Sequence, residues 1–275
     1  MSFKIANLPV GGDSPLLFIV GPCVIESEEH TVKLALALAR IAREEGLPLV
    51  FKASFDKANR TSVDSYRGPG MEAGLELLAK ARAASGLPLC TDIHEVWQAE
   101  PVGAVVDVVQ IPAMLARQTD LLVAAGETGK PVNVKKMQMA APGDMVYAAR
   151  KIESTGNRQV LLCERGSAFG YHNLVVDMRG LVEMAELGYP VVFDATHSVQ
   201  KPSGAGGKSG GDSRLAPVLA RAAVATGALS ALFFEVHDNP AKALSDGPNM
   251  LDLEAFRRTA RQCRALAELV RREQA

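Results

Sequence analysis

The chain has 275 residues, of which 48% are hydrophobic and 22% are charged, and its formal net charge is -1. These values are ordinary for a globular protein, and the near-neutral balance excludes a broad basic surface for nucleic acid or for an acidic membrane. An anionic ligand would have to be held by a local cluster of basic side chains.

Eight short apolar runs recur along the chain, and polar turns and helical patterns separate them. The runs span residues 16–20, 48–53, 88–92, 105–111, 131–134, 159–163, 190–194 and 231–235. They are continuous rather than alternating, which is typical of parallel strands that are buried on both faces. Amphipathic stretches predict helices over 31–45, 71–84, 120–128 and 213–226, and a last helix over about 252–272.

The glycine and proline residues between these elements favour a repeated strand–helix unit. A glycine stands two residues before a proline ahead of four strands, at Gly46, Gly86, Gly129 and Gly188, which is typical of helix ends. We therefore predict one domain over 1–275, a closed (β/α)8 TIM barrel with a short N-terminal extension at 1–14. The alternative is a doubly wound open sheet, but Gly21-Pro22-Cys23 is not the GxGxxG turn expected there. The irregular stretch 201–212 predicts an active-site loop.

The sequence also bears on the compartment. No apolar run reaches the roughly 18 residues of a membrane span, and residues 1–14 lack a charged-then-apolar signal pattern. The cysteines, at 23, 90, 163 and 263, are widely spaced and form no CxxC pair. This pattern predicts a reduced cytoplasmic protein, in which at least two cysteines are buried and inert.

Polar residues follow every predicted strand, and in a closed parallel barrel the site lies at those C-terminal ends. They are Cys23 and Glu26; Lys52, Lys57, Asn59 and Arg60; Asp92 and His94; Gln110; Lys135 and Lys136; Glu164 and Arg165; Asp194 and His197; and Glu235, His237 and Asp246. Taken alone, Lys136, Glu164 or His237 would be interpreted as a solvated residue at a strand end. Their recurrence at all eight ends favours one shared site.

Four cations from different parts of the chain, Lys52, Lys57, Lys135 and Arg165, would meet at this mouth. Like charges repel, and burying them without partners is unfavourable. A ligand carrying two or three negative charges would compensate them, and phosphate and carboxylate groups fit.

A second set, Cys23, His197, Glu235 and Asp246, comes from neighbouring barrel strands. Thiolate, imidazole and carboxylate groups bind Zn2+, Fe2+ or Mn2+. The spacing is too scattered to be a sequence motif, so a buried cysteine beside a hydrogen-bonded histidine remains the alternative.

Longer motifs add a family resemblance. They are GPC (21–23), FKASFDKANRTS (51–62), TDIHE (91–95), QIPA (110–113), RQTDLL (117–122), NVKK (133–136), FGYHNLVVD (169–177), DATHSVQ (194–200) and SGG (209–211). Together they resemble the 3-deoxy-D-manno-octulosonate 8-phosphate synthase family from about residue 16 to residue 270. The run Lys57-Ala58-Asn59-Arg60 distinguishes that family from the related heptulosonate 7-phosphate synthases, which carry Lys-Pro-Arg-Thr there.

The resemblance implies a homotetrameric (β/α)8 barrel without nucleic-acid or membrane partners. It would join phosphoenolpyruvate, D-arabinose 5-phosphate and water for lipopolysaccharide biosynthesis. By resemblance, phosphoenolpyruvate is held by Lys52, Lys57, Lys135 and Arg165, and Gln110 also binds substrate. Asn59, Arg60 and Thr61 serve the aldose phosphate, with Arg60 reaching a neighbouring subunit's site. Predicted catalytic residues are Asp92, His197, Glu235 and Asp246.

The resemblance also implies a metal. One class of the family has Cys after Gly-Pro in the first turn and keeps a metal, whereas the other has Asn there and needs none. Cys23 therefore predicts one divalent ion, Zn, Fe, Mn or Co, held with His197, Glu235 and Asp246. Ser245 agrees, because the metal-free class commonly has Cys before that Asp.

Three other functions remain as alternatives. A heptulosonate 7-phosphate synthase would use erythrose 4-phosphate, and a sialic-acid-type synthase is more distant. A non-catalytic sensor of sugar phosphates would keep the basic cluster but could lose a metal ligand or Asn59, and here the full set is present.

Overall fold

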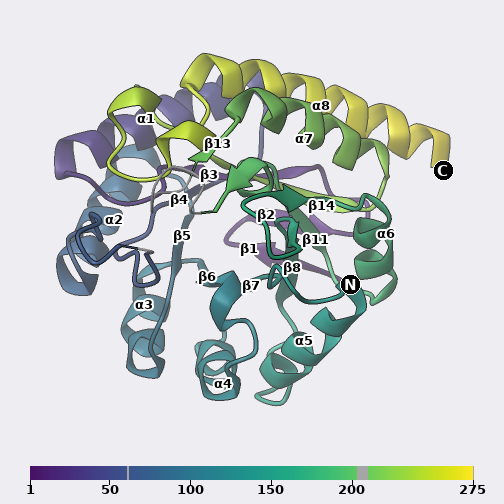
Figure 1. Ribbon diagram of the computed structural model, residues 1–275, viewed down its shortest axis with the longest axis horizontal. Coiled ribbons are helices and arrows are strands. Elements are labelled where there is room, and N and C mark those ends of the chain that lie inside the picture. Colours follow the sequence, from purple (N-terminus) through teal and green to yellow (C-terminus); the bar gives the residue numbers. More distant parts are fainter. Residues whose placement is uncertain (61, 203–209, 275) are drawn as a thin grey trace.

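The computed structural model describes residues 1–60, 62–202 and 210–274. Eight parallel strands close into a barrel, with the last strand beside the first (Figure 1). In barrel order the strands are β3 (Leu17–Gly21), β4 (Leu49–Lys52), β5 (Leu89–Asp92), β6 (Val108–Ile111), β7 (Val132–Lys135), β8 (Val160–Glu164), β11 (Val191–Asp194) and β14 (Leu229–Glu235). The predicted TIM barrel is confirmed, and the open-sheet alternative is wrong.

Helices surround the barrel (Figure 1). They are α1 (Glu28–Glu45), α2 (Met71–Ser85), α3 (Ala99–Val105), α4 (Thr119–Glu127), α5 (Met145–Glu153), α6 (Arg179–Glu186), α7 (Ala216–Ala225) and α8 (Leu253–Gln274). Helix α1 shows why they begin and end where they do: the Ser27 side chain accepts the N–H of His30, and Gly46 closes the helix at φ 63°. A left-handed residue at that position favours glycine.

Several predicted boundaries were wrong, among them the start of the first helix, which begins at Glu28. Residue 105 ends α3 and does not begin a strand, since β6 starts at Val108. The helix predicted from residue 213 begins as a 3-10 turn, Ser213–Leu215, and becomes α7 at Ala216. Val105 and Val106 are apolar but precede the polar Asp107 and the strand, whereas Ser213 and Arg214 are polar and belong to the 3-10 turn. Hydrophobic pattern alone therefore does not mark either boundary.

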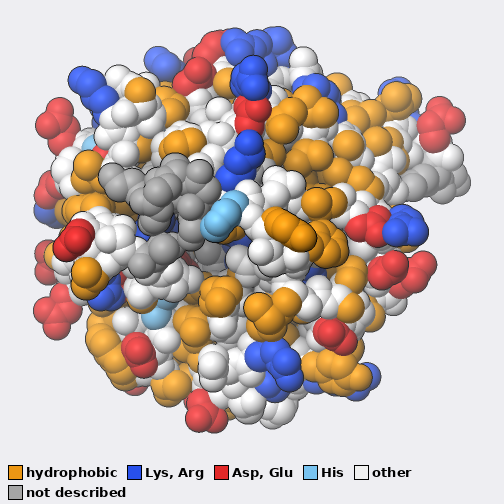
Figure 2. Space-filling model, viewed as in Figure 1, with side chains coloured by type: hydrophobic (Ala, Val, Ile, Leu, Met, Phe, Trp, Pro, Cys, Tyr) orange, Lys and Arg blue, Asp and Glu red, His pale blue; other side chains and the backbone are white. Residues whose placement is uncertain are grey.

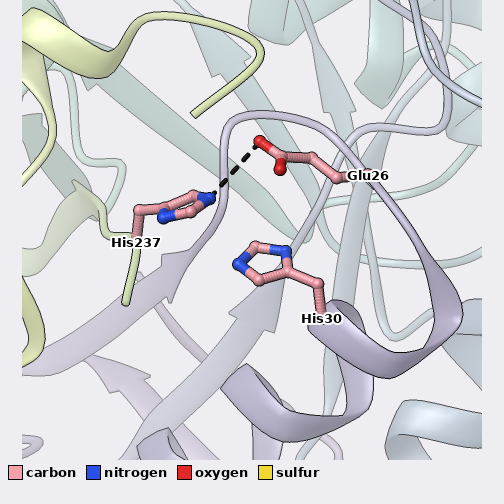
Figure 3. Close-up of side chains that lie close together, drawn as sticks. All are labelled: Glu26, His30 and His237. Carbon is pink, nitrogen blue, oxygen red and sulfur yellow. Dashed lines mark ion pairs between the residues drawn. The ribbon is translucent and has the colours of Figure 1, made fainter. Parts of the chain in front are cut away.

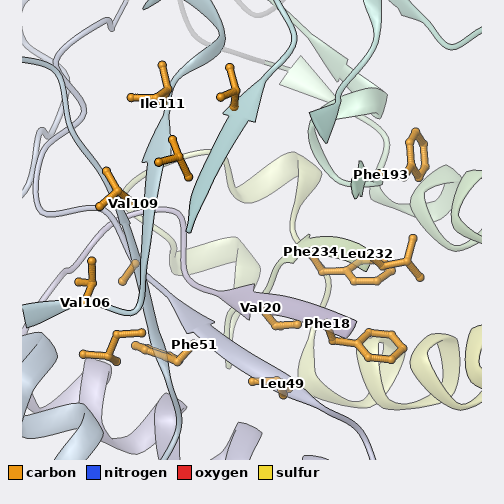
Figure 4. Close-up of a cluster of buried hydrophobic side chains, with 14 of the residues drawn as sticks. Phe18, Val20, Leu49, Phe51, Val106, Val109, Ile111, Phe193, Leu232 and Phe234 are labelled. Atoms are coloured by element: carbon orange, nitrogen blue, oxygen red, sulfur yellow. The ribbon is translucent and has the colours of Figure 1, made fainter. Parts of the chain in front are cut away.

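The main core lies between the barrel and the helices. Phe18, Val20, Phe51 and Phe234 come from neighbouring strands and are fully buried in it (Figure 4). Phe256 of α8 packs edge-on against Phe234, with ring centroids 5.7 Å apart. Burying such aromatic side chains is among the largest favourable contributions to folding.

The predicted N-terminal extension is an antiparallel hairpin, β1 (Ser2–Ile5) and β2 (Leu8–Gly11). Ile5 and Val10 are fully buried and join the apolar layer inside the barrel, where they pack with Leu17, Val192 and their neighbours. The hairpin leads directly into β3. It therefore closes the end of the barrel at which the strands begin.

Short hairpins lie beyond the opposite end: β9 (Ser167–Ala168) pairs with β10 (Leu174–Val175), and β12 (Gln200–Lys201) pairs with β13 (Gly210–Gly211). The predicted loop 201–212 includes Lys201 of β12 and all of β13, and its residues 203–209 lie outside the described residues. On the face seen in Figure 2, charged side chains of both signs are interspersed with hydrophobic ones.

All four cysteines are free and buried, as the sequence predicts for at least two of them. In the part of the chain that the structure describes, no helix has both the length and the apolar character needed to cross a membrane.

Candidate active site

A cavity of about 1020 Å³ opens where the barrel strands end. The predicted site residues that line it are Lys52, Lys57, Asn59, Arg60, Asp92, Gln110, Lys135, Arg165, His197 and Asp246. Two others, Cys23 and Glu235, are buried within reach of Asp246. Thr61 lies outside the described residues. The barrel thus gathers nearly the whole predicted set at one mouth.

Glycine at the end of β3 lets Cys23 reach this site. A Cβ at Gly21 would lie 1.9 Å from the carbonyl oxygen of Lys52, so no side chain fits between β3 and β4 there. Two residues later, Cys23 Sγ lies 3.0 Å from Ser245 Oγ and 3.7 Å from Asp246 Oδ2. Burial raises the pKa of the Cys23 thiol to about 12, and the Glu235 carboxylate adds to the rise. A nearby cation would favour the thiolate instead.

Three of the four predicted metal ligands lie together, and the fourth, His197, lies beside two of them. Donor atoms of Cys23, Glu235 and Asp246 lie within 4.8 Å of one another. His197 Nε2 lies 3.6 Å from Glu235 Oε1 and 3.9 Å from Asp246 Oδ2. Glu235 Oε1 is buried and has no hydrogen-bond partner among the described residues, which is unfavourable unless another group satisfies it. A mixed S, N, O donor set with an unsatisfied carboxylate oxygen fits a divalent transition metal.

Asp194 orients the histidine. Its Oδ1 accepts the backbone N–H of His197 at 2.9 Å, and its Oδ2 lies 2.7 Å from His197 Nδ1. Burial opposes ionisation of Asp194, but His197 and the paired Lys135 outweigh it and hold the pKa of the carboxyl well below its usual range. With Nδ1 facing Asp194, Nε2 faces the ligand cluster, as in many metal-binding histidines. Asp194 was predicted at a strand end without a role, although its position three residues before His197 is a signal that could have indicated one.

Asp246 adopts an unusual backbone conformation, with φ at 52°. Left-handed backbone at a residue other than glycine stores strain and is frequent at functional sites. Arg60 donates to its Oδ1 at 2.9 Å and also reaches Cys23 Sγ at 3.5 Å. Arg60 therefore lies in the mouth of its own barrel, and its reach to a neighbouring subunit's site stays a prediction.

A second cluster of possible metal ligands, apart from that of Cys23, Glu235 and Asp246, contains Glu26, His30 and His237 (Figure 3). The rings of His30 and His237 stack with centroids 4.3 Å apart. His237 Nδ1 accepts the N–H of Asn239, so in the neutral ring Nε2 carries the proton, and it faces Glu26 Oε1 at 3.4 Å. Glu26 Oε1 also accepts the N–H of Leu244 at 2.9 Å. These contacts explain the cluster as a brace between the loops that carry Cys23 and Asp246.

The positive charges of Lys52 and Lys57 are compensated only in part by the groups around them. Lys52 Nζ donates to Cys23 O at 3.0 Å and to Ser54 Oγ at 2.9 Å. Both ammonium groups stand near Glu235 Oε1, at 3.6 Å and 3.7 Å. Burial and the charge of Lys57 together lower the pKa of Lys52. An anion bound beside these two groups would relieve that repulsion.

Asp92 is another buried carboxylate whose charge acts on Lys52. It accepts the hydroxyl of Ser54, and His94 Nε2 lies 3.2 Å from its Oδ2. Burial disfavours the charged carboxyl, but the hydrogen bond with His94 and the charge of Lys52 hold its pKa well below the usual value. Asp92 is therefore ionised at neutral pH. His94 contacts it from behind and is not among the residues that line the cavity.

Lys135 and Arg165 are the other two of the four predicted cations that line the cavity. Lys135 pairs with Asp194, and its ammonium lies 3.3 Å from the centre of the Phe233 ring. Arg165 Nη2 donates to Gln200 Oε1 at 3.1 Å, while its buried Nη1 has no hydrogen-bond partner among the described residues. A buried guanidinium with an unused donor is ready to bind an oxyanion. Gln200, the first residue of β12, was not predicted, because nothing in the sequence marks it as a partner of the arginine that follows β8.

Comparison with known proteins shows the family of this chain. The model of the DAHP synthetase I family matches residues 3–272. The chain belongs to this family. Its curated relatives include proteins named 2-dehydro-3-deoxyphosphooctonate aldolase. The one from Syntrophotalea carbinolica is 54% identical over 270 residues, covering 98% of this chain and 97% of the relative. The one from Desulfatibacillum aliphaticivorans is 57% identical over 248 residues, covering 90% of each. The one from Geotalea uraniireducens is 54% identical over 268 residues, covering 98% of each.

One sequence-based interpretation of this DAHP synthetase I family member was wrong. Lys136, Glu164 and His237 are not solvated residues at strand ends, since their exposed fractions are 0%, 4% and 3%. His237 belongs to the brace described above. Lys136 and Glu164 pair with each other outside the cavity, with Lys136 Nζ 3.5 Å from Glu164 Oε2.

Proposed function

We propose that this protein condenses phosphoenolpyruvate with D-arabinose 5-phosphate and water to give 3-deoxy-D-manno-octulosonate 8-phosphate and inorganic phosphate. The observation that carries the proposal is the mouth of the barrel, where four basic side chains converge beside the cluster of Cys23, His197, Glu235 and Asp246. The names of the curated relatives support the same reaction.

Phosphoenolpyruvate is the anion that the four basic side chains bind. It carries a phosphate and a carboxylate, and four positive charges line the cavity from the ends of β4, β7 and β8, those of Lys52, Lys57, Lys135 and Arg165. Arg165 Nη1 is the best placed donor, because it is buried and has no partner among the described residues. Each charge-assisted contact is worth about 1.5–3 kcal/mol. Gln110 lines the same cavity and contributes a neutral polar contact.

The aldose phosphate lies toward the outer part of the cavity. Asn59 and Arg60 line it there, and Thr61 follows them in the sequence. The run Lys57-Ala58-Asn59-Arg60 favours the five-carbon aldose over erythrose 4-phosphate, the substrate of the heptulosonate alternative. Reach of Arg60 into a neighbouring subunit would require it to leave Asp246, which it contacts here.

The reaction forms a carbon–carbon bond from carbon 3 of the enol to the aldehyde carbon, and water adds at carbon 2. Phosphate leaves with its C–O bond broken. Holding two anions within reach of each other is the main contribution of the basic cavity. Asp92 is the ionised carboxylate beside Lys52, and His197 presents Nε2 toward Glu235, so these residues are placed to hold or accept protons.

The ligand set of Cys23, His197, Glu235 and Asp246 would hold one divalent ion, Zn, Fe, Mn or Co. Such an ion supplies a positive centre that polarises an aldehyde or activates water. Asp194 fixes the ring of His197 for this purpose, and Ser245 and Arg60 contact the thiol and the carboxylate of the set.

The proposal extends to the setting of the enzyme. Four buried, free thiols suit the reducing cytoplasm. Large apolar side chains that are more than half exposed, Trp97, Phe169 and Tyr171, are what a homotetramer interface would cover. The eight-carbon sugar acid phosphate would feed lipopolysaccharide biosynthesis.

A panel of aldose phosphates tests the proposal. Purified protein is supplied with phosphoenolpyruvate and one aldose, and release of inorganic phosphate is measured. Arabinose 5-phosphate should give much faster release than erythrose 4-phosphate. Equal rates, or preference for the four-carbon sugar, would favour the heptulosonate reaction, and no release with any aldose would favour a non-catalytic barrel.

A further inference from the structure

Two adjacent lysines at the end of β7 point in different directions. Lys135 lines the cavity, whereas Lys136 is fully buried away from it. The ammonium of Lys136 donates to Met137 O, Ala140 O and Ser167 Oγ, each at 3.2 Å. A lysine ammonium has three N–H donors, and all three are used. Lys136 is therefore committed to the protein and is not available to a substrate.

Glu164, at the end of the neighbouring strand β8, has a matching role. Its Oε1 accepts the backbone N–H groups of Arg165 at 2.9 Å and Gly166 at 2.6 Å. Its Oε2 lies 3.5 Å from Lys136 Nζ. Gly166 has φ at 94°, a conformation that favours glycine, so the chain turns sharply here. The carboxylate thus holds the backbone of the turn that carries Arg165.

The pair joins the loops that follow β7 and β8. The Lys136 ammonium holds carbonyls of the first loop and the Ser167 hydroxyl of the second. The backbone N–H of Ala168 also donates to Gln138 O at 2.9 Å. A buried ion pair is weak evidence for stability, because desolvation offsets much of its attraction. Its value here lies in the geometry that it imposes on the residues next to it.

We infer that Lys136 and Glu164 are a positioning pair that sets Lys135 and Arg165 for the phosphoenolpyruvate anion, an inference that rests on the proposed function. Each partner is covalently adjacent to one of these two cations. Arg165 has a single side-chain anchor among the described residues, Gln200 Oε1, and leaves Nη1 for the ligand. Its backbone must therefore be fixed from behind, and Glu164 supplies that support.

Two substitutions test the inference. Lys136→Met keeps the length of the side chain but removes the ammonium, whereas Glu164→Gln keeps an oxygen for the two backbone N–H groups and removes the charge facing Lys136. Each should raise the KM for phosphoenolpyruvate roughly ten- to a hundredfold, as a small misplacement of binding groups does. The KM for arabinose 5-phosphate should stay unchanged. Calorimetry with phosphoenolpyruvate alone should show the same loss of affinity without turnover.

Lys151→Met is the matched control, because the Lys151 ammonium also donates to a backbone carbonyl, Arg117 O, but at the surface. It should bind phosphoenolpyruvate like the unaltered protein. Unchanged affinity in Glu164→Gln, or an equal rise of both KM values in either folded variant, would overturn the inference. If Lys136→Met fails to fold, Glu164→Gln decides. Failure of the proposed function is distinct, since the unaltered protein would then release no phosphate with arabinose 5-phosphate.

Discussion

At the end where the barrel strands begin, the hairpin β1–β2 inserts Ile5 and Val10 into an apolar layer, whereas at the end where they finish the buried side chains are charged. The apolar end needs nothing more than close packing. The charged end holds Lys52, Lys135 and Glu235 at exposed fractions of 1%, 4% and 1%. Burying such groups is unfavourable unless ligands or partners compensate them.

This difference separates stability from function along the axis of one barrel. Changes at the hairpin should alter the free energy of unfolding and leave catalysis intact. Changes at the charged end should alter ligand binding or turnover first.

Loss of the metal ligand set should have the largest effect. Chelation with EDTA or dipicolinate should abolish turnover, and added divalent metal should restore it. Cys23→Ser should bind metal poorly, because the hydroxyl is a harder and weaker ligand than a thiolate, and elemental analysis of the purified variant measures this. Cys263→Ser, a change at a buried thiol of α8, should keep its metal. Full turnover in protein shown to be free of metal would remove Cys23 from the site.

Removal of a basic side chain should have the next largest effect. Arg165→Ala should weaken phosphoenolpyruvate binding by about 1.5–3 kcal/mol, since one charge-assisted contact is lost. Calorimetry measures the affinity, and circular dichroism checks the fold. Arg158→Ala is the control at the other end of the same strand, where Arg158 is exposed. Equal affinities for the two variants would show that the charged end of β8 does not bind the ligand.

The hairpin should affect stability alone. Ile5→Ala removes part of a fully buried side chain and should lower the free energy of unfolding by about 2–5 kcal/mol. Chemical denaturation measures the change, and kcat and both KM values should stay as they are. A fall in kcat in the folded variant would mean that the two ends are coupled.

The two ends should also differ in their response to pH. The pKa of Asp194 lies below its ordinary value of 3.8 in the folded chain, since His197 and Lys135 overcome the effect of burial. A lowered pKa stabilises the fold above the unfolded value and loses that contribution as the pH falls through the folded value. The destabilisation caused by Asp194→Asn should therefore shrink below about pH 4, whereas that of Ile5→Ala should not depend on this group. Denaturation curves from pH 7 to pH 3 would contradict this if the Asp194→Asn difference stayed constant.

Much of this organisation could be predicted from the sequence, because covalent order alone places the C-terminal ends of parallel strands at one mouth. Thus Cys23 and Asp246, 223 residues apart, were expected to meet and do. The direction in which each side chain points was harder to predict. Lys135 and Lys136 are adjacent, yet only the first lines the cavity, because successive residues of a strand point to opposite faces.

Contacts made by loops could not be predicted in the same way. The hydrogen bond from Arg60 to Asp246 depends on how two loops pack against each other, and no local sequence pattern predicts it. The same holds for the brace of Glu26, His30 and His237 (Figure 3). A histidine after a strand is compatible with a ligand, a proton donor or a structural contact until its neighbours are known.

Oxygen-18 water distinguishes the proposed condensation from hydrolysis of the phosphate. The protein is incubated with phosphoenolpyruvate, arabinose 5-phosphate and labelled water, and both products are examined by mass spectrometry. We expect label at carbon 2 of the eight-carbon product and unlabelled inorganic phosphate, because water adds to carbon and the C–O bond of phosphoenolpyruvate breaks. Label in the phosphate would mean that water attacks phosphorus, and the charged end of the barrel would then be a phosphatase site instead.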